Sequence, residues 1–341
     1  MNKEKNYFMQ EVRGVLIICV IVIHCLGYSR TNEMINYFNI SVRTIVNFCV
    51  ATFIFMAAYF VKQNEVNSSK KDFYKKRIKR LLVPFFIWSF IYSIIWMIRN
   101  YEKIQIMGLV KSFLLGTNAP QLYYLIVLLQ LTAITPVLIK IVEKRKVILD
   151  IMIFAITPIY TIFVALFQYK FGRIFSYYNI IFVAWITFYY LGLWIKNKKW
   201  NINKMKIRKI SIVMIGIVIV FIMVNMLEYN KGCIYSYCAT QIKLTNVLYS
   251  AIICILIFAI SQLSVKRKQP NWLYVLGDLS FGIYLIHYIF ILISKAILEP
   301  LQINYIMQSI IMIVSTLTIS FITIKSFKKL SNHKVDVYLG L

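Results

Sequence analysis

The chain has 341 residues, of which 60% are hydrophobic and 15% charged, and its mean hydropathy is +0.71. This composition excludes a water-soluble globule and favours a protein that lies in a lipid bilayer. The formal net charge of +27 would suit a nucleic-acid-binding protein, but the basic residues cluster in short segments between apolar runs. Such clustering is typical of loops kept on the cytoplasmic side of a membrane, so we expect no nucleic-acid partner.

Ten apolar runs follow one another, each long enough to cross about 30 Å of hydrocarbon at about 1.5 Å per residue. They cover residues 12–28, 44–61, 81–98, 121–139, 147–167, 178–195, 210–227, 245–263, 272–294 and 303–324. The sequence therefore predicts an all-α, polytopic transmembrane helical bundle, with membrane lipids as its surroundings. No linker or repeat divides residues 1–341, so we expect a single domain. The Lys and Arg distribution predicts a multi-pass protein of the cell membrane with both termini in the cytoplasm.

The first run carries two ionisable residues, Arg13 and His24. No small-residue cleavage pattern follows the run, so we expect a retained helix and no signal peptide. Eleven residues correspond to roughly 1,100° of helix, so both side chains project from nearly the same face, about 16 Å apart along the axis. An ionisable side chain inside a span is costly and marks a candidate site. The alternative for His24 is a neutral imidazole that hydrogen-bonds between helices.

The segment 62–80 holds eight Lys and Arg and precedes the third run. Residues 70–82 suit an amphipathic helix that lies on the inner surface and binds anionic lipid. Anchoring of this kind explains most of the lysines, but Arg77 and Arg80 lie about one turn apart and could contact phosphates. Together with Arg13 they suit a ligand with an anionic head at the membrane surface and a reactive end deep in the bundle, a shape that coenzyme A has.

The later runs add further candidates. Tyr123 and Tyr124 open the fourth run at its outer face, where we favour an aromatic belt over stacking against a sugar ring. Asp278 lies about one turn inside the ninth run, where an ion pair with a surface cation is expected. His287 lies deeper in the same run and is either a second functional group or a structural histidine.

Four of the six cysteines fall within apolar runs, whereas Cys233 and Cys238 share the loop 228–244 that we place outside. Thiols there are exposed to oxidising conditions, so a disulfide is one possibility and two unpaired thiols are the other. No spacing of metal ligands appears, and we expect no metal.

Five stretches in the correct order resemble the membrane acyltransferase-3 family, many of whose members O-acylate cell-surface polysaccharides. The most specific is RGVLIICVIVIH, in which ten residues separate Arg13 from His24, as in the family pattern. FIFMAAYFV is similar to the second family helix, although Ala57 and Ala58 stand where Ser and Gly are usual.

The other three stretches extend the resemblance over nearly the whole chain. FYKKRIKRLLVPFFIWS resembles the basic entry to the third helix, with Arg77 and Arg80 at its arginine positions. LYYLIVLLQLTAITPVL resembles the aromatic-Tyr-Leu start of the fourth helix, with Tyr123 in place of the commoner Trp. SFGIYLIH, which ends at His287, is close to the late-helix signature.

The resemblance implies an acyl-CoA donor, with acetyl-CoA expected, bound from the cytoplasm by Arg13, Arg77 and Arg80. It implies that His24 acts as general base or transient acyl carrier, with an orienting partner from another span. The acceptor would be a hydroxyl of a cell-surface or lipid-linked polysaccharide. The alternative is a non-enzymatic transporter of a lipid-linked saccharide, which the low Gly and Pro counts, 11 and 6, disfavour.

Overall fold

The computed structural model describes residues 7–100, 106–198, 204–263, 270–330 and 340. All regular secondary structure in these residues is helical, as the composition predicts. Nine helices of the described chain are long and apolar enough to cross a membrane. They are α1 (Tyr7–Cys25), α2 with α3 (Glu33–Val46 and Phe48–Tyr59), α5 (Lys70–Arg99), α7 (Tyr123–Glu143), α8 (Val147–Phe171), α10 (Lys204–Asn230), α12 (Leu244–Leu263), α14 (Ser280–Leu298) and α15 (Tyr305–Leu330).

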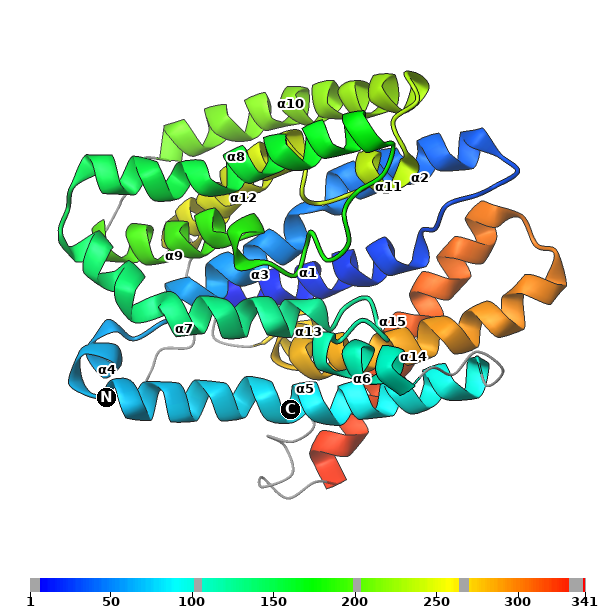
Figure 1. Ribbon diagram of the computed structural model, residues 1–341, viewed down its shortest axis with the longest axis horizontal. Helices are drawn as coiled ribbons and strands as arrows, with labels where there is room; N and C mark the ends of the chain where they lie inside the picture. The colour runs from blue at the N-terminus through cyan, green and yellow to red at the C-terminus, as the bar shows by residue number, and fades with distance from the viewer. Residues whose placement is uncertain (1–6, 101–105, 199–203, 264–269, 331–339, 341) are drawn as a thin grey trace.

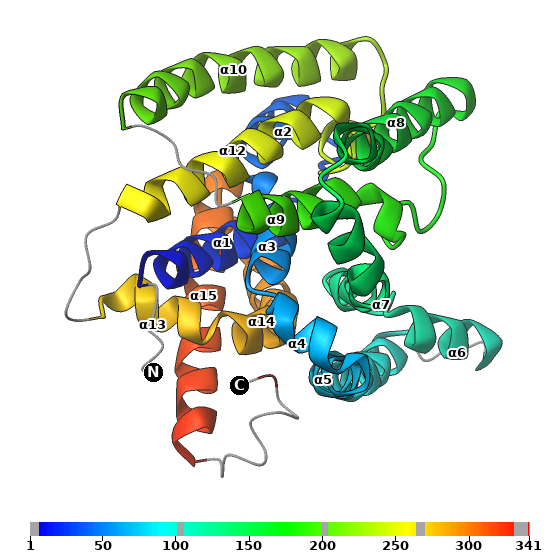
Figure 2. The same ribbon diagram turned by 90° about the vertical axis from the view of Figure 1, so that its left-hand side faces the viewer.

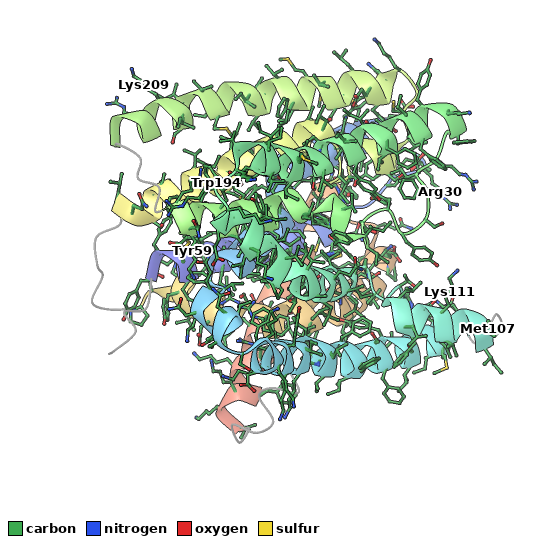
Figure 3. The ribbon with its side chains drawn as sticks, turned by 60° about the vertical axis from the view of Figure 1, so that its left-hand side comes forward. Arg30, Tyr59, Met107, Lys111, Trp194 and Lys209 are labelled. Atoms are coloured by element: carbon green, nitrogen blue, oxygen red, sulfur yellow. The ribbon has the colours of Figure 1, made fainter. Side chains whose placement is uncertain are left out.

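Most of the helices run along the long axis of the bundle, so most loops gather at its two ends, whereas α15 crosses the others steeply (Figures 1 and 2). One end, where α5, α8 and α10 begin, carries most of the basic loop residues; we call it the basic end. The opposite end is where α1 and α8 end and α7 and α12 begin. Tyr59 and Lys209 mark the basic end, and Arg30 and Lys111 mark the opposite end (Figure 3).

The sixth predicted span, residues 178–195, is not one continuous helix. A 3-10 turn, η2 (Phe182–Ala184), precedes α9 (Ile186–Lys198), which has only 13 residues. The side chain of Gln130 supplies hydrogen-bond partners for the irregular backbone. Its Nε2 donates to the Ile180 carbonyl at 3.0 Å, and its Oε1 accepts from the Phe182 amide at 2.9 Å. Non-helical backbone within a membrane needs such internal partners. The shortened helix leaves room beside it that the candidate site uses.

The second span is also interrupted. Asn47 separates α2 from α3, and its Nδ2 donates to the carbonyls of Ala239 and Thr240 at 3.3 Å each. Asn32 caps the start of α2, where its side chain accepts from the Ile35 amide. The predicted run, 44–61, therefore covers the second half of a longer bent element.

The basic stretch before the third span does not form a separate surface helix. It is the first part of α5, a single 30-residue helix that starts where Ser69 Oγ accepts from the Asp72 amide at 3.2 Å. The expected surface helix over residues 70–82 is therefore wrong, because the helix continues through Pro84 without ending. The first turns of α5 therefore carry their Lys and Arg side chains at the basic end of the bundle.

Four short helices complete the described chain: α4 (Gln63–Ser68), α6 (Ile106–Leu115), α11 (Tyr235–Cys238) and α13 (Trp272–Asp278), with a 3-10 turn, η3 (Glu299–Leu301), after α14. Seen along the helices, α1 and α3 lie in the middle of the bundle, and α10 lies at its edge (Figure 2). Glycine allows α1 to approach α13 closely, since a Cβ on Gly277 would lie 1.8 Å from the Gln10 carbonyl oxygen. This contact fixes α1, which carries Arg13 and His24.

Candidate active site

A cavity of about 420 Å3 opens among helices at the basic end, and we call it the basic cavity. The three arginines selected from the sequence meet there: Arg13 comes from α1, and Arg77 and Arg80 come from α5. Lys62 and Lys76 also line the cavity. Arg77 and Arg80 line the same cavity because residues three apart on α5 share a face of the helix.

These cations differ in how they are partnered. Lys62 pairs with Glu65 at 2.6 Å, which also lines the cavity. Arg77 lies over the Phe73 ring at 5.4 Å, and Arg13 Nη1 donates weakly to Gln10 Oε1 at 3.4 Å. In the described part of the chain no carboxylate lies within ion-pair distance of the three arginines. The basic cavity therefore has an excess of positive charge available to an anionic ligand.

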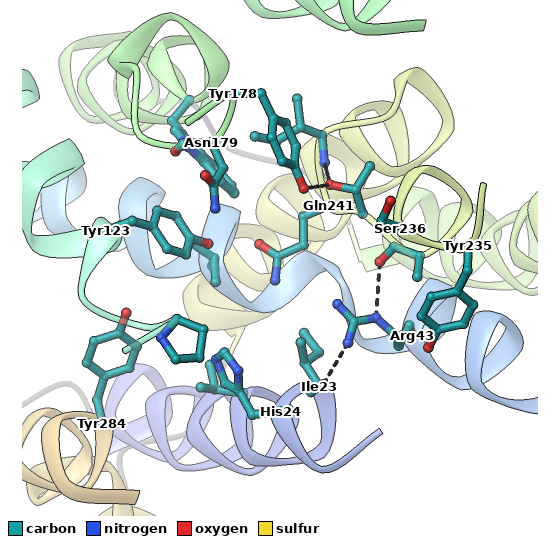
Figure 4. Close-up of a pocket in the computed structure, with 17 residues that line it drawn as sticks. Ile23, His24, Arg43, Tyr123, Tyr178, Asn179, Tyr235, Ser236, Gln241 and Tyr284 are labelled. Atoms are coloured by element: carbon teal, nitrogen blue, oxygen red, sulfur yellow. Dashed lines mark hydrogen bonds between the residues drawn. The ribbon is translucent and has the colours of Figure 1, made fainter. Parts of the chain in front are cut away.

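A second cavity, of about 290 Å3, lies toward the opposite end of the bundle and contains His24; we call it the histidine cavity (Figure 4). Its walls come from α1, α2, α3, the start of α7, the irregular segment before α9, α11 with the loop that follows it, and α14. The rings of Tyr123 and Trp185 stack in its wall, with centroids 6.2 Å apart and an interplanar angle of 27°. The amides of Asn179 and Gln241 point into the same space (Figure 4).

Two tyrosines lie between the two cavities. Tyr124 lines the basic cavity and Tyr284 lines the histidine cavity, and their ring centroids are 5.3 Å apart. Both side chains are buried, with 8% and 5% of their surface exposed. The Tyr284 hydroxyl donates to the Gln121 carbonyl, which holds this ring in place. This pair, which contributes one ring to each cavity, is called the tyrosine wall.

His24 has a second histidine beside it. The ring of His287, from α14, lies 5.3 Å from the His24 ring and is fully buried. His287 Nδ1 donates to the carbonyls of Tyr284 and Ile283, at 2.7 and 3.2 Å, so its Nε2 carries a lone pair, and that atom has no partner among the described residues. An acceptor atom this close to His24 suits a group that orients it.

Arg43, on α2, completes the polar lining of the histidine cavity. Its Nη1 donates to the carbonyls of Ile23 and Leu26, at 2.7 and 3.3 Å, and its Nε donates to the Ala239 carbonyl at 3.1 Å. Sequence reasoning missed this residue because the predicted second span began one residue after it, which made it an ordinary loop cation. The sequence signal that could have identified Arg43 is an arginine placed directly before an apolar run.

The two tyrosines of α7 do not behave as the aromatic belt that we favoured. Tyr124 is buried inside the bundle and lines the basic cavity, so the belt interpretation is wrong for it, and it does not reach the histidine cavity where a sugar could bind. Tyr123 lines the histidine cavity and stacks on Trp185. The consecutive side chains thus face different cavities, because successive residues of a helix are about 100° apart.

Two further expectations, for Asp278 and for the loop cysteines, can be compared with the structure. Asp278 pairs with Lys328 at 2.7 Å, which confirms the expected structural ion pair. Cys233 and Cys238 are both unpaired thiols, so of the two alternatives the structure has no bridge. Burial raises the pKa of the Cys238 thiol to about 12. Among the described residues no group of three or more His, Cys, Asp or Glu could hold a metal ion.

The family described as an acyltransferase domain, acyltransferase-3, matches residues 6–325. No curated protein and no solved structure matches the chain.

Proposed function

The chain belongs to the acyltransferase-3 family and is a multi-pass membrane acyltransferase, and from this premise we propose which group it moves and between which molecules. The donor is acyl-CoA, with acetyl-CoA the expected form, and it enters from the cytoplasm at the basic end. The acceptor is a hydroxyl of a cell-surface or lipid-linked saccharide at the opposite end. The observation that carries this proposal is the pair of cavities on α1, one at Arg13 and one at His24, with the tyrosine wall between them.

The basic cavity supports the choice of donor. Coenzyme A carries phosphates at one end and a thioester at the other, so it needs cations at the entrance and a reactive group deeper in the bundle. Arg13, Arg77 and Arg80 supply guanidinium donors in a space that α1, α3, α5, α7, α9 and α14 enclose. Arginine suits phosphate because its planar fork can make two parallel hydrogen bonds. Arg13 and His24 are eleven residues apart on α1, about 16 Å along the axis, so the ligand spans the distance between entrance and base.

The reaction that follows is acyl transfer from sulfur to oxygen. His24 accepts the proton of the acceptor hydroxyl as the oxygen attacks the thioester carbonyl, and the carbon–sulfur bond then breaks. Coenzyme A leaves as the thiolate and takes up the proton that His24 had accepted. One ester and one thiol are formed from one hydroxyl and one thioester, so no other reactant is needed.

His287 acts in this scheme as a positioning residue. When His24 becomes an imidazolium, its second N–H needs an acceptor, and His287 Nε2 is the unpartnered atom nearby. No direct hydrogen bond joins the two rings in the described structure. With 5.3 Å between their centroids, a hydrogen bond can form when His24 is protonated, either directly or through one water. The helix carbonyls that hold His287 Nδ1 keep the lone pair on Nε2.

The histidine cavity supports a saccharide acceptor. Sugar rings present apolar faces to aromatic side chains and hydroxyls to amides, and this cavity offers both kinds of partner. Tyr123 and Trp185 provide stacked rings, and Asn179 and Gln241 provide amides (Figure 4). Ser236, in α11, lines the cavity and is exposed, so the cavity reaches the surface at the end opposite the cations.

The proposal is tested by incubating the purified protein with acetyl-CoA labelled in the acetyl group and measuring both release of coenzyme A and label on an added saccharide. Transfer should occur with the wild-type protein, and His24→Ala should lower it by about 100- to 10,000-fold, since it removes the general base. A transporter would neither release coenzyme A nor label the saccharide. Unchanged transfer by His24→Ala would refute the role of this residue.

A further inference from the structure

Arg43 brings a positive charge into the histidine cavity that its own contacts do not balance. Its guanidinium donates to three backbone carbonyls, those of Ile23, Leu26 and Ala239. Carbonyls at the end of α1 carry partial negative charge, equivalent to roughly half an elementary charge for a whole helix end, so they offset part of the cation. In the described chain no carboxylate is within ion-pair distance of Arg43, and no Asp or Glu is among the described residues that line this cavity.

A purely structural role does not require this charge. Asn47, one turn further along, ties the same loop to the second span through neutral hydrogen bonds to the Ala239 and Thr240 carbonyls. A cation within a bundle costs free energy unless it is paired, and such residues in membrane proteins mark ligand sites. Arg43 also keeps donor capacity, because Nη2 makes no hydrogen bond with a described residue.

The free side of the guanidinium faces the place where a substrate would react. In Figure 4 the Arg43 head lies across the cavity from His24, with the amide of Gln241 between them. Two more polar atoms nearby are buried without a partner among the described residues, Gln241 Oε1 and the Tyr235 hydroxyl. The Arg43 guanidinium and the Gln241 amide thus share one space with His24, and Tyr235 borders the same cavity behind Arg43 (Figure 4).

An anion bound in this space before the reaction starts would have to come from the acceptor. In the proposed function the phosphates of coenzyme A are bound in the basic cavity, on the other side of the tyrosine wall, and an acetyl group carries no charge. From this we infer that the acceptor is an acidic saccharide, whose carboxylate or phosphate ester binds Arg43 while a neighbouring hydroxyl faces His24. This inference rests on the proposed function and adds the chemical class of its acceptor.

Binding of three small probes to the purified full-length protein tests the inference without requiring turnover. The probes are methyl glucuronide, with a carboxylate; methyl glucoside 6-phosphate, with a phosphate ester; and methyl glucoside, which is neutral. We expect at least one charged probe to bind about tenfold or more tightly than the neutral probe, as a charge-assisted hydrogen bond would give. The charged probe that binds more tightly identifies the source of the anion. Equal binding of all three probes would overturn the inference.

Two variants of Arg43 separate binding from folding. Arg43→Gln can still donate to the Ala239 carbonyl but has no charge, so it should lose the preference for the charged probe, whereas Arg43→Lys should keep it. The thermal midpoint of each variant without a probe reports any loss of folding. Retention of the full preference by Arg43→Gln would overturn the inference.

Turnover of the same probes distinguishes this inference from the proposed function. If no probe promotes release of coenzyme A but the charged probe binds through Arg43, the proposed function fails while the acidic-ligand site stands. If all probes are acylated equally and Arg43→Gln slows them equally, Arg43 stabilises the reaction and does not select the acceptor. That result would contradict the inference and leave the proposed function intact.

Discussion

Replacing His287 should slow acyl transfer in a way that depends on which ring nitrogen the new side chain imitates. Asparagine places its amide near Nδ1 and can still donate to the carbonyls of Ile283 and Tyr284, but it has no acceptor at the position of Nε2. Glutamine reaches the position of Nε2 and can present an oxygen there. The two variants are similar in polarity, so each serves as a control for the other.

The size of the effect follows from one hydrogen bond to a charged partner. Such a bond contributes about 1.5–3 kcal/mol, and each 1.36 kcal/mol changes a rate tenfold, so His287→Asn should lower kcat by about 10- to 150-fold. His287→Gln should recover much of that loss. Because His287 does not line either cavity, KM for acetyl-CoA and for the saccharide should stay near the wild-type values in both variants.

The assay is release of coenzyme A from acetyl-CoA over a range of both substrates, with the thermal midpoint of each variant as the measure of folding. Equal losses of kcat in the asparagine and glutamine variants would refute a role for Nε2. A wild-type kcat in His287→Asn would show that the second histidine is structural, which is the other interpretation of this residue.

Three further predictions concern the proposed donor site, the packing of α1 and the loop that carries Cys233. Arg80→Gln should raise KM for acetyl-CoA by about tenfold with little change in kcat, because it removes a phosphate contact made throughout the reaction, whereas Lys79→Gln, outside the basic cavity, should leave both constants unchanged. Gly277→Ala should lower the thermal midpoint, since its Cβ would lie 1.8 Å from a carbonyl oxygen, whereas Gly216→Ala, with nothing within 4 Å, should not. Cys233 should react with an impermeant maleimide before any reduction.

Different results would contradict each of these predictions. A fall in kcat at unchanged KM would place Arg80 away from the donor. Equal thermal midpoints for the two glycine variants would mean that α1 and α13 can separate without cost. Labelling of the loop only after reduction would show a disulfide, and labelling only after the membrane is permeabilised would reverse the orientation of the bundle.

What the sequence predicted well depends on local helix geometry. The eleven-residue spacing predicted that Arg13 and His24 share a face of α1, and both side chains line cavities, although two separate ones; Arg77 and Arg80 share a cavity because they lie three residues apart. Helical spacing of this kind holds whatever the helix packs against.

What the sequence did not predict depends on contacts between distant segments. The partner near His24 comes from α14, and nothing in the first span could name it. The break before α9 depends on Gln130, about fifty residues earlier in the chain, and this break helps to form the histidine cavity. The sequence did not indicate Arg43 as a site residue, because its neighbours in the chain resemble a loop boundary. Its hydrogen-bond partners, such as Ala239, are far away in sequence.

In the proposed reaction an acyl group passes from a donor at the basic end to a saccharide at the opposite end. Proteoliposomes of known protein orientation test it most directly, with labelled acetyl-CoA supplied on one side only and saccharide on the other. We predict labelled saccharide only when acetyl-CoA meets the basic end, where Arg13, Arg77 and Arg80 lie, and none with His24→Ala. Equal labelling from either side, or release of coenzyme A without any labelled saccharide, would contradict this account.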